Sequence, residues 1–469
     1  MSEAKDLFVL LRQSAHARVA DAIQRLVLEG EDHQLCRINV PAFAARQGLD
    51  EEAAIAAFLH ATRIGIFEIS WNILCPGCGG VLDANATLRT VRKEAYTCSL
   101  CASDYSPTLD EMVDVTFTVN SRVRRIAAHD PHGLPLLEYY RQMYWGSGVD
   151  VPEEDYEAVM NRFLIDHVEL DPGEKGVLSI QLPAQFVIVF EPITHSAQFI
   201  DVSGDPTRDR QSLSLVFDRA HMHNHTLKMR PGPLRIALEN RVDTRVLPSV
   251  FIAGEALHAM IDTRRPFLTA QRLLSNQTFR DLYRTSTLDV DQRLKITSIT
   301  FLFTDLRGST ELYERVGDLA AFDLVKAHFQ VLNEIVASEA GAVVKTIGDA
   351  VMATFPTPHR AVAAALRMRE AMRDLNDRNG REDLLLKIGV HEGPCIAVML
   401  NERQDYFGQT VNIASRVQGL ASSQSIFATG SVVEDGRTIE LLKRRALTPQ
   451  SSSVTLRGID REFRIYAIP

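Results

Sequence analysis

The sequence predicts an α+β protein built of several domains. Three observations point to this class: the chain has 469 residues, its middle part is rich in strand patterns, and strands alternate with helices after about residue 294. Hydrophobic residues make up 45% of the chain and charged residues 24%, the balance of a globular protein with several cores. The changes of pattern divide the chain into five expected segments: residues 1–71, 72–109, 110–268, 269–293 and 294–469.

The first segment, residues 1–71, is expected to be a small winged helix. Pro41 stands where a second helix could begin and Asp50 can cap a third, after which the stretch Ile64 to Trp71 would add a strand hairpin. The third helix begins with Asp-Glu-Glu and holds one firm positive charge, Arg63, so a phosphate backbone would repel it. Since the whole chain carries a net charge of −9, we expect no nucleic-acid binding and favour a protein-contact or scaffold role.

Four of the six cysteines form two Cys-x-x-Cys pairs separated by nineteen residues. These four are Cys75, Cys78, Cys98 and Cys101. In a reducing compartment such pairs are metal ligands rather than disulfides, and four thiolates make a closed tetrahedral site. Residues 72–109 are therefore expected to be a zinc ribbon with one structural Zn²⁺. The isolated Cys36 and Cys395 are expected to be buried structural residues.

The sequence also bears on location. No apolar stretch approaches the roughly 20 residues that cross a bilayer. The N-terminus lacks the basic start and apolar block of a secretory signal. We therefore expect a cytoplasmic protein without a membrane span.

Residues 110–268 are expected to form a β-rich, sandwich-like domain. Its strand runs are broken by Pro and Gly, and a more helical interval from Leu136 to Ile165 interrupts them. The runs are Val177–Ile180, Phe186–Phe190, Leu234–Leu238 and Val246–Ile252. An aromatic cluster in the helical interval either lines a ligand pocket or packs in the core; it consists of Tyr139, Tyr140, Tyr144 and Trp145. Residues 269–293 are polar with scattered Leu, as in a connecting helix or linker.

After residue 294 the expected order of elements is βαββαβ, that of a ferredoxin-like sheet with helices on one face. Strands are expected at Ile299–Thr304, in a hairpin over Val343–Phe355 and at Leu385–Val390. Helices are expected at Leu319–Glu339, Pro358–Asn376 and Gly408–Leu420. In the first helix the apolar residues fall on one stripe: Phe322, Val325, Phe329, Leu332 and Val336.

Two acids stand at strand ends in this domain. Asp305 ends the apolar strand that begins at Ile299, and Asp349 lies at the tip of the hairpin that carries Lys345. Two carboxylates from adjacent strand ends could hold a pair of divalent ions about 4 Å apart, as phosphoryl transfer requires. Each acid taken singly is also explained as a cap or a turn residue.

Asn412 and Arg416 are four residues apart, so on a helix they share one face. Arg416 offers a planar fork of donors to phosphate oxygens, and Asn412 adds a neutral donor. Taken alone, such a pair is usually explained by a solvated helix face.

Taken together, these segments resemble the catalytic domain of class III adenylate and guanylate cyclases. The resemblance extends from Thr297 to the C-terminus, and its motifs match in order, spacing and local context. The motifs are Phe-Thr-Asp305-Leu-Arg-Gly-Ser-Thr, Lys345-Thr-Ile-Gly-Asp349 and Val-Asn412-Ile-Ala-Ser-Arg416.

The resemblance implies a role for each matching position. Asp305 and Asp349 look like the aspartates that bind two divalent cations per site, Mg²⁺ or Mn²⁺. Lys345 and Asp405 match the pair that recognises adenine, the Lys donating to ring N1 and the Asp accepting from the 6-amino group. Because Lys presents only donors and an ionised Asp only acceptors, this pair suits adenine and mismatches guanine.

Two further roles follow from the same resemblance. Asn412 and Arg416 look like the transition-state residues, which orient the ribose and neutralise charge at the α-phosphate. The phosphate-binding basic residue of some members is expected at Arg457, with Arg461 and Arg464 as neighbouring alternatives.

The implied reaction converts ATP to cyclic AMP and pyrophosphate. The ribose 3′-oxygen attacks the α-phosphorus in line, with Asp305 or a water as base and charge stabilisation by the metals. In this family the site lies between two head-to-tail domains, and the chain carries one copy of every element, so a homodimer with two sites is expected.

The N-terminal half resembles, more weakly, the region that precedes the cyclase in some bacterial soluble cyclases. The order of parts implies that it regulates the cyclase in response to an unknown ligand or protein. Two alternatives stay open: a guanylate cyclase, and a zinc-ribbon regulator whose cyclase-like domain binds nucleotide without catalysis.

Overall fold

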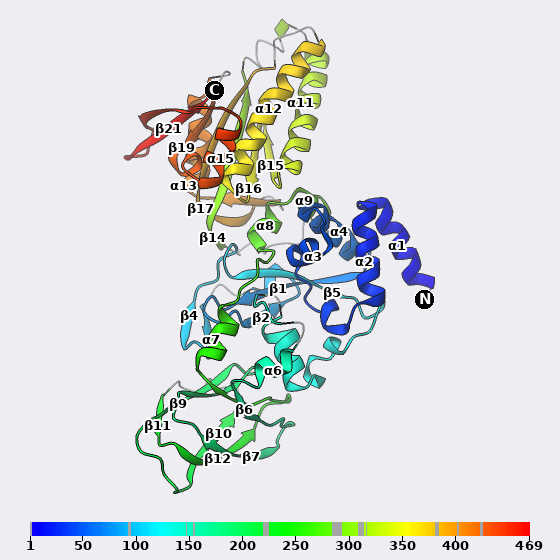
Figure 1. Cartoon of the computed structure of the whole chain (residues 1–469). Coiled ribbons are helices and arrows are strands. Elements are labelled where there is room, and N and C mark those ends of the chain that lie inside the picture. Colours follow the sequence, from blue (N-terminus) through cyan, green and yellow to red (C-terminus); the bar gives the residue numbers. More distant parts are fainter. Residues whose placement is uncertain are drawn as a thin grey trace. The chain divides into compact units, whose positions relative to one another are not determined.

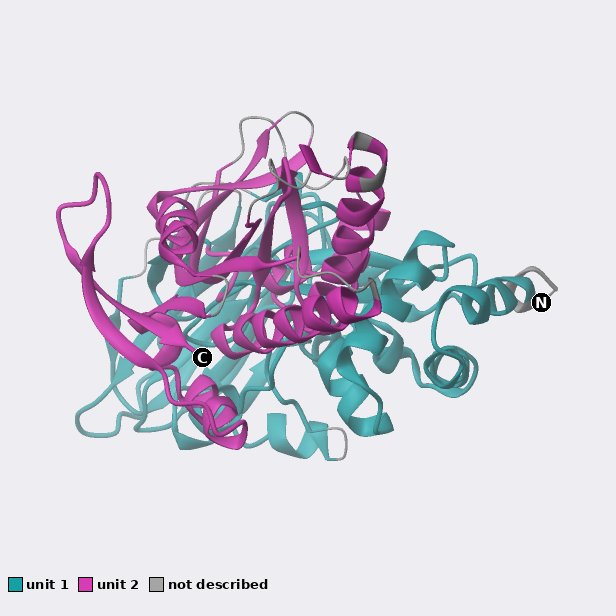
Figure 2. Cartoon of the chain, turned by 90° about the horizontal axis from the view of Figure 1, so that it is seen from above, with its two compact units in different colours: residues 1–107, 112–268 teal, residues 108–111, 269–469 magenta. Residues whose placement is uncertain are grey.

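The computed structural model describes residues 2–91, 95–146, 148–152, 155–218, 225–283, 293–307, 314–315, 317–379, 384–400, 403–422 and 425–469. The chain divides into two compact units (Figures 1 and 2). Unit 1 comprises residues 1–107 and 112–268, and unit 2 comprises residues 108–111 and 269–469. Two parts of the sequence-based expectations, residues 308–310 of the Asp305 motif and residues 284–292 of the linker, lie outside the described residues.

Unit 1 opens with helices that pack through aromatic rings. They are α1 (Ser2–Ser14), α2 (Ala17–Glu29), the short 3-10 turn η1 (Asp32–Leu35), α3 (Val40–Gln47) and α4 (Glu51–Arg63). Asp50 caps α4 as expected, since its side chain accepts from the backbone N–H of Ala53 at 2.9 Å. Phe58 of α4 stacks on Phe67 at the start of the first strand, with ring centroids 4.9 Å apart.

A three-stranded sheet and a small hairpin follow the helices. The sheet has the order β2 (Val81–Asn85), β1 (Phe67–Leu74), β5 (Val113–Val119). The hairpin joins β3 (Tyr96–Cys98) to β4 (Ser103–Tyr105). These strands carry the cysteine pairs at their ends, so the four thiols come from two neighbouring turns.

The aromatic cluster of the helical interval packs in the core. Tyr140, Tyr144 and Trp145 are at most 1% exposed and belong to the same hydrophobic cluster as three of the cysteines. Tyr140 and Tyr144 lie in a π-helical turn, Tyr140–Tyr144, that follows α5 (Leu136–Tyr139) and precedes α6 (Tyr156–Met160), and Trp145 directly follows this turn. Of the two expectations for this cluster, core packing is therefore the one that the structure supports.

The strand-rich part of unit 1 contains two small sheets that share one core. One has the order β10 (Gln211–Phe217), β12 (Gly232–Asn240), β7 (Lys175–Leu182). The other has the order β11 (Leu227–Met229), β9 (Ser196–Val202), β8 (Val187–Glu191), β13 (Ser249–Ile252), β6 (Leu164–His167). Buried residues of both sheets, such as Ile236 of β12 and Val189 of β8, form one hydrophobic cluster. Helix α7 (Glu255–Asp262) follows them.

In the described part of unit 2, eight strands form one sheet, with the order β15-β16-β14-β17-β19-β21-β20 and β18 paired to β17. Their bounds are β14 Leu294–Leu306, β15 Ala342–Ile347, β16 Ala350–Phe355, β17 Leu386–Leu400, β18 Arg403–Phe407, β19 Ile426–Thr429, β20 Gln450–Thr455 and β21 Glu462–Ile468. The helices are α8 Ala270–Leu274, α9 Gln277–Leu282, α11 Asp318–Ser338, α12 Pro358–Asn379, α13 Gln409–Leu420, α14 Gly430–Val433 and α15 Gly436–Arg444. The order β14-α11-β15-β16-α12-β17 is the expected βαββαβ.

Helices α11 and α12 lie side by side against the sheet and bury their apolar stripes in its core (Figure 1). Leu332 and Val336 of α11 are fully buried, as their spacing predicts. Phe322 differs from the prediction, because it is 61% exposed. It lies in the beginning of α11, ahead of Val325, the first residue of this stripe that reaches the core.

Strand β17 runs far beyond the Val390 at which the sequence predicts its end. It continues through Gly393 and Pro394 because the pairing register with β14 shifts between Ile296 and Ile299. A bulge of this kind accommodates a proline, which cannot donate to the ladder. The extension supplies the edge on which β18 pairs. Among the described residues, no helix has the length and apolar character needed to cross a bilayer.

Candidate functional site

The two strand-end acids lie next to each other in unit 2. Asp305 is the penultimate residue of β14, and Asp349 occupies the turn between β15 and β16 after Gly348, whose φ is +62°. β14 pairs with β16 in antiparallel register, with Thr304 opposite Val351, and this places the strand end beside the turn. The Val351 N–H also donates to Thr304 Oγ1 at 3.2 Å, which anchors the turn to β14.

The acid pair carries an electrostatic cost in the absence of a cation. Partial burial raises the pKa of Asp305, and the neighbouring charge of Asp349 raises this pKa further, while Lys387 and Gln418 act in the opposite direction. Asp349 Oδ2 is buried and has no hydrogen-bond partner among the described residues. A bound cation would satisfy that oxygen and screen the repulsion between the two carboxylates. The two acids therefore fit a divalent-metal site.

A buried histidine of α11 lies behind the acid turn. His328 is 0% exposed, and its Nδ1 lies 3.5 Å from the sulfur of Met372. Burial lowers the pKa of His328 to about 4, although the charge and backbone of Asp349 oppose this shift. The ring is therefore neutral near pH 7 and adds no positive charge beside Asp349.

Lys345 and Asp405 form an ion pair across two strands. Lys345 Nζ of β15 donates to Asp405 Oδ2 of β18 at 2.5 Å. Asp405 is 7% exposed, and its second oxygen accepts from the backbone N–H of Tyr406 at 2.9 Å. The two side chains that are expected to recognise the base are therefore in direct contact.

Helix α9 is attached directly behind this ion pair. Arg280 Nη2 donates to the carbonyl of Val344 at 3.3 Å and to that of Gln404 at 3.0 Å, the residues just before Lys345 and Asp405. The Val343 N–H donates to Gln277 Oε1 at 2.8 Å. One guanidinium therefore ties the two strands together, a feature that the sequence-based analysis missed.

The α13 pair lies on a helix that packs tightly on the sheet. Ile413 and Val417 are buried, while Asn412 is exposed and Arg416 is half-buried. The helix approaches β17 so closely that a Cβ on Gly389 would lie 2.1 Å from the backbone N of Gln418. Only glycine permits this approach at that position.

The loop that carries Arg457 lies beside Arg416. A Cβ on Gly458 would lie 3.6 Å from Arg416 Nη2, and Arg457 itself is exposed. Arg461 instead lies over the Phe463 ring at 4.5 Å, and Arg464 pairs with Glu434 at 3.2 Å. Of the three candidates for the phosphate-binding residue, Arg457 is favoured because its loop lies next to Arg416.

Three groups thus stand in unit 2: the acid pair, the Lys345–Asp405 pair, and Arg416 with the Arg457 loop. Among the described residues, no hydrogen bond or ion pair joins the acid pair to the Lys345–Asp405 pair. Asp305 instead has a side-chain hydrogen bond with Gln418, near the end of α13.

The four cysteines of the paired motifs gather in unit 1. Cys75 Sγ lies 3.7 Å from Cys101 Sγ, and Cys78 Sγ lies 3.7 Å from Cys98 Sγ. All four sulfurs lie within 4.8 Å of one another. A tetrahedral zinc ion with Zn–S bonds of about 2.3 Å requires S···S distances of about 3.8 Å, so this cluster could bind Zn²⁺. Cys36 and Cys395 are buried, as expected, and neither belongs to this cluster.

Two family models match the chain. The model of a family of unknown function, DUF5939, matches residues 1–281, and the model of the adenylate and guanylate cyclase catalytic domain matches residues 292–468. The chain belongs to the DUF5939 family. In this DUF5939 protein, the C-terminal part is a class III nucleotidyl cyclase domain.

The relatives of this DUF5939 protein include both kinds of cyclase. An adenylate cyclase of Anabaena cylindrica is 29% identical over 185 residues, which are 36% of this chain and 36% of that protein. Guanylate cyclase 32E of Drosophila melanogaster is 31% identical over 140 residues, 27% of this chain and 12% of that protein. The crystal structure of the adenylyl cyclase CyaB from P. aeruginosa is 25% identical, covers 38% of this chain and 96% of its own, and has a TM-score of 0.33. The chain thus spans about a third or less of the length of these two sequence relatives. These matches do not decide whether the substrate is ATP or GTP.

Proposed function

We propose that the protein is an adenylate cyclase that converts ATP to 3′,5′-cyclic AMP and pyrophosphate at the interface of a homodimer. The observation that carries the choice of base is the Lys345–Asp405 pair, which holds a donor and an acceptor side by side. Adenine presents an acceptor at N1 next to a donor at its 6-amino group, and guanine presents the reverse pattern at these positions. The pair therefore complements adenine.

The remaining residues bind and orient the triphosphate. Asp305 and Asp349 would hold two divalent cations, Mg²⁺ or Mn²⁺, which supply charge neutralisation at the phosphates and acidify the ribose 3′-hydroxyl. Arg416 directs its planar fork to the α-phosphate, and Asn412 orients the ribose. Arg457, beside Arg416, adds a cation for the outer phosphates. With Asp305 ionised, its carboxylate or a water receives the proton of the 3′-hydroxyl.

A second copy of the chain is needed to bring these groups together. Large apolar side chains are exposed beside the base-recognition pair: Ile347 is 54% exposed and Phe407 is 67% exposed. Phe322 at the beginning of α11 is 61% exposed. Covering such side chains favours association, and in a twofold dimer each protomer would add its acids to its partner's Lys345, Asp405 and Arg416.

The test is an assay of the purified full chain with Mn²⁺ and either ATP or GTP. We expect cyclic AMP from ATP and at least a tenfold lower rate with GTP, because guanine would set a donor against Lys345 and an acceptor against the buried Asp405 carboxylate. Cyclic GTP as the main product would make the protein a guanylate cyclase, and the absence of both products would favour nucleotide binding without catalysis. The same assay on residues 291–469 alone measures whether residues 1–281 restrain or support the reaction, since we propose that they regulate it.

Arg280 is expected to control the affinity for ATP without contacting it. In Arg280→Met the two strands lose their shared donor, so Lys345 and Asp405 are held less firmly. We expect KM for ATP to rise about three- to tenfold, with the Mn²⁺ dependence unchanged. Arg373→Met, an exposed arginine of α12, is the matched control and should leave KM as it is. An unchanged KM in Arg280→Met would show that α9 has no part in base binding.

A further inference from the structure

A small cavity in unit 1 is lined by four arginines. Its volume is about 60 Å³, and three separate stretches of the chain surround it. Its lining includes Arg37, Arg46, Arg141 and Arg265 together with His33 and Asn39, and no Asp or Glu is among the described residues that line it. We propose that this arginine cavity binds a small oxyanion of about the size of phosphate.

Arg37 holds a backbone conformation that non-glycine residues rarely adopt. Its φ is +47°, and the residue is 7% exposed. Its N–H donates to Thr118 Oγ1 at 3.0 Å, and its guanidinium donates to the carbonyl of Met143. Such strain persists only where the surroundings enforce it, and it is concentrated at functional sites. A guanidinium has five N–H donors, so the carbonyl contact leaves donors for an anion.

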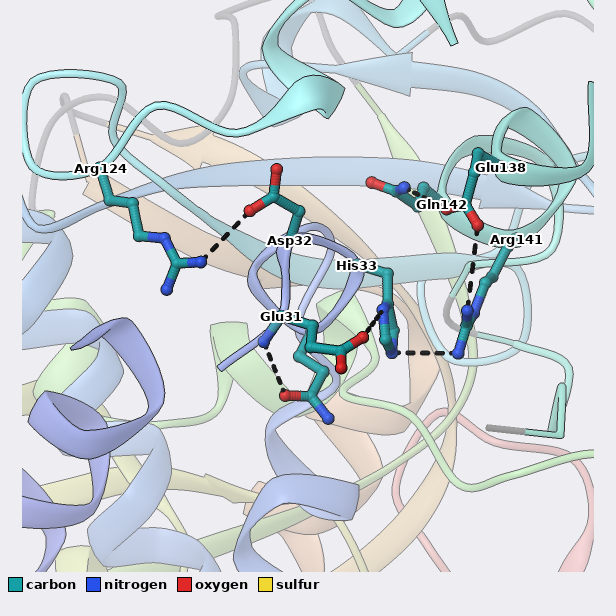
Figure 3. Close-up of polar contacts among 8 residues, drawn as sticks. Glu31, Asp32, His33, Arg124, Glu138, Arg141 and Gln142 are labelled. Carbon is teal, nitrogen blue, oxygen red and sulfur yellow. Dashed lines mark hydrogen bonds and ion pairs between the residues drawn. The ribbon is translucent and has the colours of Figure 1, made fainter. Parts of the chain in front are cut away.

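Arg141, which is among the lining residues of this cavity, is held by a chain of side chains (Figure 3). Its Nη2 lies 3.0 Å from Nε2 of His33, and His33 Nδ1 lies 3.5 Å from the carboxylate of Glu31. Because Nε2 has to accept from the guanidinium, the imidazole is neutral and carries its proton on Nδ1, toward Glu31. Glu138 lies 3.9 Å from Arg141 Nη1, and the Tyr156 ring lies 5.5 Å from the guanidinium carbon. These contacts fix the plane of the Arg141 fork.

The third stretch of chain contributes Arg265, and helix α3 closes the cavity. Arg265 Nε donates to the Val149 carbonyl at 3.3 Å and lies 3.3 Å from Asp150. Asn39 caps α3 by accepting from the Ala42 N–H at 3.0 Å, so the positive end of the helix dipole lies at the lining. An anion in the cavity would therefore join residues 33–46, residues 141–151 and Arg265.

The volume and the charges of the cavity select the class of ligand. A cavity of about 60 Å³ holds a few waters or one small oxyanion, and a nucleotide is far too large for it. Guanidinium forks match the paired oxygens of phosphate, sulfate or a carboxylate. Arg37, Arg141 and Arg265 are largely buried, so they favour a doubly charged anion over a singly charged one, although Glu138 and Asp150 lie beside two of them.

The test is calorimetric titration of the full chain with inorganic phosphate at low ionic strength. We expect one saturable site per chain, competition by sulfate, and weaker binding of acetate and bicarbonate. In Arg141→Gln and Arg265→Gln the affinity for phosphate should fall roughly tenfold or more, because each loses a charge-assisted fork. Arg235→Gln removes an exposed arginine from β12 of the same unit and should bind like the unaltered chain.

Melting curves without phosphate show whether the variants are folded. If a Gln variant melts early, Arg141→Lys replaces it; this variant keeps the charge and should still weaken binding, because Lys cannot offer a planar fork. The proposal is overturned if no anion gives a saturable site in the folded chain. It is also overturned if Arg141→Gln or Arg141→Lys binds phosphate as tightly as Arg235→Gln. Since the titration measures phosphate binding directly, its outcome does not depend on cyclase activity.

Discussion

Asp305→Asn and Asn412→Ala are each expected to lower cyclic AMP synthesis by roughly 10²–10³-fold, and a mixture of the two variants is expected to recover activity. In the proposed site, the first removes a carboxylate that would hold the divalent cations, and the second removes the group that would orient the ribose. In a mixed dimer one site carries both defects, and the other carries neither. Equal amounts that exchange freely should therefore give about a quarter of the unaltered activity.

The measurement is the initial rate in Mn²⁺ and ATP after the two variants have been mixed and incubated. Asp374→Asn, an exposed acid of α12, serves as the control for the loss of a carboxylate and should remain active. A mixture that stays as inactive as its components, although size measurements show dimers, would contradict a site shared between protomers.

Loss of one ligand of the proposed zinc site is expected to have the second large effect. In Cys78→Ser the cluster loses one of four ligands whose sulfurs lie within 4.8 Å of one another. Since Cys78 also packs among the buried aromatic residues of unit 1, we expect unit 1 to lose its bound zinc. We further expect it to melt about 10 °C or more below the unaltered chain.

Zinc content by atomic emission and melting by calorimetry check this prediction together. Cys36→Ala is the matched control, because Cys36 is also a buried cysteine of unit 1 but stands outside the cluster. It should keep one zinc per chain. Unaltered protein that is folded and holds no zinc after purification in zinc-containing buffer would refute the assignment.

The sequence allows the main parts of the site to be predicted because they depend on short-range order. The strand pattern before Asp305 and the Gly348-Asp349 turn place two acids at neighbouring strand ends, where the β14–β16 register brings them together. The two Cys-x-x-Cys pairs likewise predict a cluster, and the four thiols converge. In both cases the local spacing places each group at the end of its own strand, and contacts between segments that are distant in the sequence bring the groups together.

Long-range packing explains what the sequence could not predict. Residues 269–293 show no strong periodicity, so nothing in them indicates that Arg280 reaches the carbonyls of Val344 and Gln404. The Gly393-Pro394 pair suggests the end of a strand, but a register shift on the neighbouring strand lets β17 continue. Phe322 follows the helical spacing of its neighbours and is still exposed, because the spacing cannot show where the sheet beneath the helix begins.

The ion pair between Lys345 and Asp405 has a consequence for selectivity. With no base present the two side chains satisfy each other, so an incoming base competes with an internal partner. A base that complements both side chains forms hydrogen bonds that replace the ion pair it breaks. A base with the opposite pattern would separate the pair and leave the buried Asp405 carboxylate without a donor, which is costly. The ion pair that exists without a base would therefore disfavour the binding of nucleotides whose base does not complement both side chains.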